Sequence, residues 1–141
     1  MRQAVAIVLG CLVAGALSGS AHACSCARSP TAEGILASAA AVFTGTVRAV
    51  GTTAPHQSVT TFVVTEAFKG VRPGEIVDVH HHSGSPAACG VTFEYGRSYT
   101  LSAAMDRGAL HASQCSTWMF LPHVGLSRDL IATMRSLRRR Q

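Results

Sequence analysis

Cysteines are the residues of this 141-residue chain whose chemistry is most evident. Cys11 lies in an apolar amino-terminal run, and Cys24, Cys26, Cys89 and Cys115 follow it. An even number of cysteines in an exported chain predicts disulfides, and four cysteines allow three pairings. Cys24 and Cys26 are one residue apart, so in an extended chain their side chains point to the same side, which disfavours a bond between them. We expect each to pair with a distant cysteine, and loss of either bond to cost about 2–5 kcal/mol.

Three consecutive histidines, His80, His81 and His82, are a second candidate for chemistry, as metal ligands. Consecutive residues of a strand point to opposite faces, so only His80 and His82 share a face. Two imidazoles without a third ligand in view favour a solvent-facing strand end over a metal site. His56, His111 and His123 stand alone in the sequence and are interpreted as ordinary surface or turn histidines. The sequence therefore predicts no cofactor.

Catalytic motifs are not recognisable in the sequence. Serines and histidines are scattered, no Gly-x-Ser-x-Gly motif occurs, and no two carboxylates are spaced in the sequence like a catalytic acid–base pair. With Cys24, Cys26, Cys89 and Cys115 oxidised, a thiol mechanism would also lack its nucleophile. We therefore expect a binding protein rather than an enzyme.

Residues 1–23 have the pattern of a secretory signal peptide. An apolar run, Ala4–Leu17, follows one basic residue and leads to Ala21-His22-Ala23, whose small residues suit cleavage before Cys24. The run is too short and too glycine-rich for a secure membrane span. Ala21-His22-Ala23 is also a poor lipobox, which disfavours lipidation of Cys24. These features predict a secreted or periplasmic protein without a stable membrane span.

Residues 24–141 have the length of one ordinary domain, and we expect a monomer with a single core. The chain has 12 lysines and arginines against 7 aspartates and glutamates, a formal net charge of +5. Four of these arginines, Arg135, Arg138, Arg139 and Arg140, lie at the carboxyl end. Because the basic charge is concentrated there, we expect no nucleic-acid surface across the domain.

Composition and periodicity predict a mainly β domain flanked by two helices. Ser29 as N-cap and Pro30 would begin a helix that continues to about Ala40. β-branched residues and alternation predict strands over residues 42–50, 59–68, 75–82, 98–105 and 109–115, with turns at 51–55, 72–74 and 106–108. Five short strands joined by turns suggest a small closed or nearly closed barrel.

An amphipathic helix is predicted over residues 127–140. Leu130, Ile131, Met134 and Leu137 fall on one face of it, and arginines crowd its last turn. We expect this face to pack on the barrel. The preceding Trp118-Met119-Phe120 segment is interpreted as core or helix-docking residues rather than a ligand face.

Several segments together resemble the inhibitory domain of the tissue inhibitors of metalloproteinases, in the netrin-like group. These segments are Cys24-Ser25-Cys26, Phe68-Lys69-Gly70, Ala88-Cys89-Gly90, Leu110-His111-Ala112-Ser113-Gln114-Cys115-Ser116 and the helix beginning near Ser127. The likeness covers most of residues 24–137. It implies a five-stranded oligonucleotide/oligosaccharide-binding (OB) type barrel. It also implies the disulfides Cys24–Cys89 and Cys26–Cys115.

The resemblance further implies a function for the amino terminus of the mature chain. The α-amine and carbonyl oxygen of Cys24 would chelate the catalytic zinc of a target metalloendopeptidase, and the side chain of Ser25 would enter its specificity pocket. Cys24 would thus contact a metal only in the partner protease. The predicted inhibitory surface comprises Cys24, Ser25, Cys26, Pro86, Ala87 and Ala88.

This chain also departs from the animal members of the family, which carry a third disulfide in this domain and a further cysteine-rich lobe. Similar small exported chains share the cysteine pattern, and a fold can be kept where its function is not. The alternative function is therefore a noncatalytic exported domain of the netrin-like fold that serves adhesion or envelope interactions.

Overall fold

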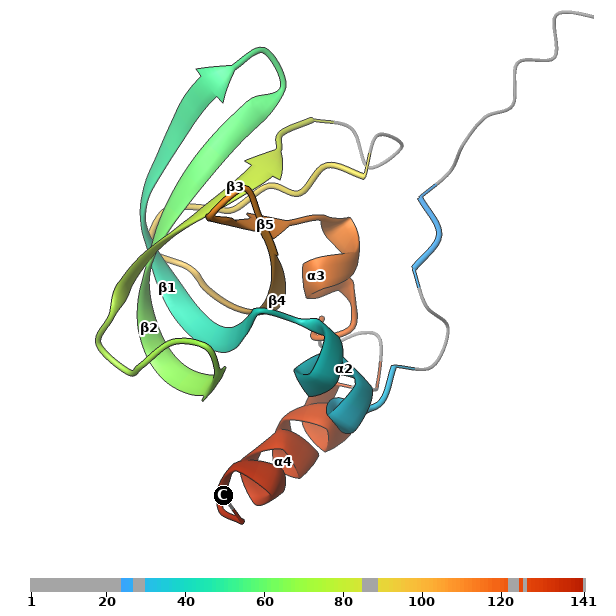
Figure 1. Cartoon of the computed structure of the whole chain (residues 1–141). Coiled ribbons are helices and arrows are strands. Elements are labelled where there is room, and N and C mark those ends of the chain that lie inside the picture. Colours follow the sequence, from blue (N-terminus) through green and yellow to red (C-terminus); the bar gives the residue numbers. More distant parts are fainter. Residues whose placement is uncertain (1–23, 27–29, 85–88, 122–124, 126, 141) are drawn as a thin grey trace, which may run out of the picture.

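The computed structural model describes residues 24–26, 30–84, 89–121, 125 and 127–140. The predicted signal peptide, residues 1–23, lies outside the described residues. The described part is mainly β, with one five-stranded sheet and three helices (Figure 1). In chain order the elements are α2 (Ala32–Ser38), β1 (Ala41–Ala54), β2 (Gln57–Lys69), β3 (Ile76–His82), β4 (Ser98–Asp106), β5 (Ala109–Ala112), α3 (Gln114–Trp118) and α4 (Ser127–Arg138).

The sheet has the strand order β1-β2-β3-β5-β4, and β1 also pairs with β4, so the ring of strand pairings closes. Neighbouring strands are antiparallel except β3 and β5, which run parallel with Val79 beside Leu110. Register shifts interrupt the β1–β2 ladder, for example between Thr44 and Gly45. Such bulges bend a long ribbon and increase its twist.

All five predicted strands are present, but one end of β1 and one end of β5 differ from the prediction by three residues or more. Residues 51–54, expected in a turn, extend β1 because Thr52 pairs with Ser58 and Ala54 with Gln57 across the hairpin. The last strand was expected to reach Cys115, yet β5 ends at Ala112. Local hydrogen bonds favour a helix there: the backbone N–H of Ser113 donates to Ser116 Oγ at 3.0 Å, as part of a capping box that begins α3.

The first described helix also begins later than the sequence suggested. Thr31 rather than Ser29 is its N-cap, because Thr31 Oγ1 accepts a hydrogen bond from the backbone N–H of Gly34 at 3.1 Å. Ser29 lies outside the described residues. The helix ends at Ser38, and Lys69 Nζ donates to the carbonyl oxygen of Leu36 at 2.6 Å, which joins α2 to the end of β2.

The main hydrophobic core lies inside the sheet and receives side chains from every strand. Its buried members are Ala41, Phe43, Val47, Phe62, Val64, Ala67, Val77, Val79, Phe93, Leu101, Ala103 and Ala112. Phe93 comes from the segment between Cys89 and β4. Its ring meets Phe62, His81 and Tyr99 edge to face, at centroid distances of 5.1, 5.0 and 5.1 Å. Each such pair contributes about 0.5–1.5 kcal/mol beyond the area it buries.

A second apolar cluster joins α2 and α4 to the sheet, and Figure 1 shows these two helices side by side. Its buried members are Ala32, Ile35, Ala39, Val42, Phe68, Phe120, Leu130 and Met134. Ile131 and Leu137 are partly buried against it, which confirms the predicted apolar face of the last helix. That helix ends at Arg138, slightly before the predicted end.

Arginines of α4 bind the sheet through side-chain contacts with β2. Arg135 donates from Nε and Nη2 to the two carboxylate oxygens of Glu66, each at 2.8 Å. Arg138 Nη1 donates to the carbonyl oxygen of Ala67 at 2.8 Å, and its guanidinium lies 5.8 Å from the ring centre of Phe68. The hydrogen bonds from Arg135 lower the pKa of Glu66, and this effect is larger than the opposing effect of burial, which raises it.

We predict that Glu66→Gln weakens the attachment of α4. Because the folded-state pKa of Glu66 is lowered, its contribution is present above about pH 4.5 and is lost as pH falls through the folded pKa. Urea unfolding should therefore show a lower midpoint for the variant at pH 7 and a smaller difference near pH 3. Glu94→Gln is the matched control, because Glu94 pairs with Arg97 at 3.2 Å on the surface. Equal midpoints for the two variants at pH 7 would contradict the prediction.

Candidate functional site

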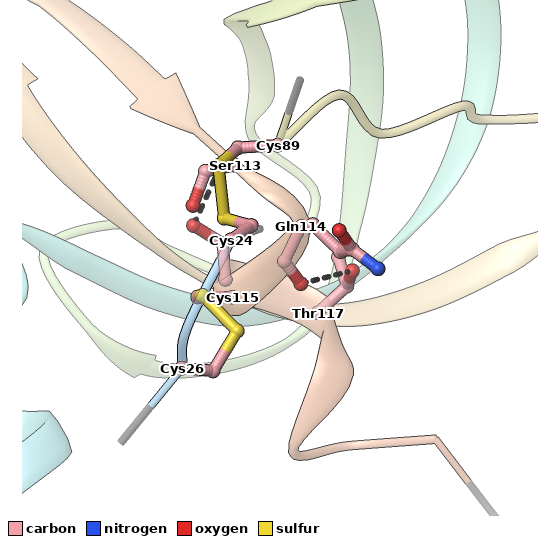
Figure 2. The surroundings of a disulfide bond; sticks show 8 residues. Cys24, Cys26, Cys89, Ser113, Gln114, Cys115 and Thr117 are labelled. Atoms are coloured by element: carbon pink, nitrogen blue, oxygen red, sulfur yellow. Dashed lines mark hydrogen bonds between the residues drawn. A yellow bond between two sulfur atoms is a disulfide. The ribbon is translucent and has the colours of Figure 1, made fainter. Parts of the chain in front are cut away.

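Two disulfides fix the amino-terminal strap, residues 24–26, against separate parts of the domain (Figure 2). The bonds are Cys24–Cys89 and Cys26–Cys115, the pairing that the resemblance implies, and each joins Cα atoms 5.3 Å apart. Cys89 follows β3 in the chain, whereas Cys115 lies in α3. The strap is therefore held at both ends, with Ser25 between them.

The two segments that receive the strap are themselves tied together. The backbone N–H of Gln114 donates to the carbonyl oxygen of Cys89 at 3.1 Å, and that of Val91 donates to the carbonyl oxygen of His82 at 3.0 Å. Cys89 has a φ of 58°, a left-handed conformation that few non-glycine residues adopt. The backbone around Cys89 is thus connected both to the last strand residue of β3 and to the start of α3.

Glycine is needed next to Cys89 because two parts of the chain approach closely there. A Cβ atom on Gly90 would lie only 3.0 Å from the carbonyl oxygen of Gly84. Gly84 and Gly90, which lie on either side of residues 85–88 in the chain, are therefore close to each other. Pro86, Ala87 and Ala88, which the sequence placed in the inhibitory surface, lie outside the described residues.

An open hollow adjoins the strap and is lined by Cys24, Ser25, Cys26, Gln114 and Trp118. The side chain of Ser25 is exposed, and both strap cysteines are partly buried. Gln114 and Trp118 are the first and last residues of α3, four positions apart, so they share one face of that helix. We call this the amino-terminal hollow.

Trp118, Met119 and Phe120 were interpreted as core or helix-docking residues, and Trp118 is not part of either apolar cluster in the described residues. Phe120 is buried and Met119 packs against the second cluster, but Trp118 is partly exposed beside the strap. Expecting a strand through Cys115 hid the helical spacing of Gln114 and Trp118. Ser113, a residue type that is favoured at helix N-caps, was the signal in the sequence that could have revealed it.

His81 is buried at 6% exposure, on the face of β3 opposite to His80 and His82, the two histidines that were predicted to form a solvent-facing strand end. Its Nε2 lies 2.8 Å from Thr60 Oγ1, and its ring stands edge-on to Phe93. Burial, which penalises the charged imidazolium, is the main cause that lowers the pKa of His81. A neutral His81 thus belongs to the core that supports the segment carrying Cys89.

His80 and His111 lie on the outer side of the same sheet and form a pair. They are register partners on β3 and β5, and their rings stack with centroids 5.3 Å apart. His111 is therefore not an isolated surface histidine. The two rings line a second hollow together with His82, Asp106, Arg107 and further polar residues. We call this the histidine hollow.

Within the described part of the chain, no group of three or more His, Cys, Asp or Glu residues is arranged to hold a metal ion. None of the described helices has the length and apolar character needed to cross a membrane. Two disulfides are typical of proteins in oxidising compartments. No model of a known protein family and no curated protein matches the chain.

Replacing His81 should change how stability depends on pH. The folded-state pKa of His81 is lowered, so unfolding takes up a proton below the unfolded pKa of about 6.5. The stability of the fold therefore decreases as the pH is lowered from about 6.5 to the folded pKa. The slope for one proton is at most about 1.4 kcal/mol per pH unit. We predict that His81→Gln removes this slope between pH 7 and 5, whereas the turn variant His56→Gln keeps it. Denaturant unfolding across this range is the measurement, and parallel pH profiles for His81→Gln and the parent would refute the assignment.

Proposed function

We propose that this protein is a secreted inhibitor of zinc metalloendopeptidases that acts through Cys24 and Ser25. The observation that supports this function is the doubly anchored strap, which presents the exposed Ser25 between two disulfides beside the amino-terminal hollow. We further propose that the sheet is an OB-type barrel. The closed ring of pairings, with β3 and β5 parallel, supports that scaffold.

The inhibitory chemistry requires that the signal peptide be cleaved after Ala23. The α-amine of Cys24 then becomes free, and with the carbonyl oxygen of the same residue it can form a five-membered chelate on zinc. A catalytic zinc keeps one coordination position for water, and the chelate would displace that water. The exposed side chain of Ser25 would enter the specificity pocket of the protease.

Rigidity of the strap favours this mechanism. Each disulfide fixes one end of the three-residue segment, so little conformational entropy is lost when a partner binds it. Trp118 and Gln114 extend the surface beside the strap with an aromatic ring and an amide. Tryptophan is enriched at protein interfaces because it combines apolar area with a hydrogen-bond donor.

Adding one alanine before Cys24 should abolish inhibition and leave the fold intact. The extension converts the α-amine into an amide nitrogen, which cannot bind zinc as a neutral amine does. Inhibition of a panel of zinc endopeptidases is the measurement, and one alanine added after Gln141 is the matched control. Equal potency of the amino-terminally extended protein would refute the mechanism. A correctly cleaved protein that inhibits none of the panel would favour the exported interaction domain instead.

Inhibition should also weaken on acidification. An α-amine titrates near pH 8, so the neutral fraction falls about tenfold for each pH unit well below that value. We predict that the inhibition constant rises correspondingly between pH 7 and 6. The protease chosen must be stable there, and a control inhibitor without an amine corrects for titration of the protease itself. A flat corrected profile would count against chelation by Cys24.

A further inference from the structure

His80 and His111 occupy adjacent positions on the outer side of the sheet. Val79 and His81 are buried toward the core on β3, so His80 between them points outward. On β5, Leu110 and Ala112 pack on the core, and His111 between them points outward too. The two residues are 31 positions apart in the sequence and meet only because β3 and β5 pair in parallel.

The spacing of the two rings suits coordination of one metal ion. An imidazole nitrogen binds such an ion at about 2.0–2.1 Å, which puts each ring centre about 3.2 Å from the metal. A tetrahedral angle at the metal then separates the two ring centres by about 5.2 Å. The observed separation is 5.3 Å, with the ring planes 29° apart. The rings are stacked face to face here, so both side chains must rotate about χ1 and χ2 before a nitrogen of each can reach a shared ion; the pairing of β3 with β5 already brings the two residues within that reach.

Both imidazole rings are accessible to a metal ion from the solvent. His80 and His111 are partly exposed, and among the described residues no other side chain forms a hydrogen bond with either imidazole. Asp106 and Arg107 line the same hollow and carry opposite charges, so fixed charge there neither attracts nor repels a cation strongly.

We propose that His80 and His111 form a two-histidine surface site for a divalent transition-metal ion of the zinc, nickel and copper class. Imidazole is a preferred ligand of these ions, and affinity along the series is greatest for copper(II). Since no third protein ligand is arranged around the pair in the described residues, water would complete the coordination shell. This site is independent of the zinc chelation proposed for Cys24.

Copper(II) is the probe that tests the site, because its electron paramagnetic resonance spectrum reports nitrogen ligands directly. The cleaved protein with an acetylated amino terminus is titrated, so that the α-amine does not compete. We expect one copper(II) ion bound with nitrogen coordination, and at least a tenfold loss of affinity in both His80→Gln and His111→Gln. The matched control, His56→Gln, should bind as the parent does. Unchanged binding in either of the first two variants would overturn the proposal.

A measurement on the unsubstituted protein guards against misfolded variants. Zinc(II) titration should shift the imidazole nitrogen resonances of His80 and His111 together, with a single binding curve. Zinc-induced shifts confined to one of the two rings, or to other histidines, would show that the pair does not share an ion and would overturn the proposal.

Discussion

The covalent attachment of Cys24 and Cys26 is the constraint on which the candidate site depends. The strap forms no helix or strand of its own, so its position follows from that of Cys89 and Cys115. Those cysteines lie in different elements, yet the hydrogen bond from Gln114 N–H to the Cys89 carbonyl oxygen connects their backbones. The two disulfides therefore attach the strap to one continuous support, and Ser25 cannot move independently of it.

That support is stabilised from inside the sheet. Phe93, four residues after Cys89, is buried in an aromatic cluster with Phe62 and Tyr99, and His81 closes the cluster against Thr60. The helices α2 and α4 pack elsewhere, through a separate apolar cluster and the contacts of α4 with β2. The second cluster thus stabilises the sheet, while the first also determines where the segment carrying Cys89 lies.

The local sequence pattern predicted most of the strands and helices. Most of what it missed depends on pairing between strands that are far apart in the sequence. Alternation of Val77, Val79 and His81 located β3 because one face of that strand is buried. The same alternation places His81 on the buried face, but it could not identify Phe93 and Thr60 as the residues that His81 contacts there. Nor could it bring His111 beside His80, because strand order sets that contact. The extra length of β1 likewise comes from its pairing with β2, which composition does not encode.

Under the proposed function, two titrating groups would influence the candidate site over different pH ranges, so their effects could be separated by varying the pH. The free α-amine of a cleaved chain would lose its zinc-binding form below about pH 8, which changes binding and leaves the fold intact. Protonation of His81 opposes its burial only below about pH 6.5, and it acts on the core that supports Cys89. A loss of inhibition between these values with unchanged folding stability would therefore come from the amine. Below about pH 6.5, protonation of His81 would also loosen the segment that carries Cys89 and would add to the loss of inhibition. The strap is only as rigid as this segment, because Cys24 is bonded to it.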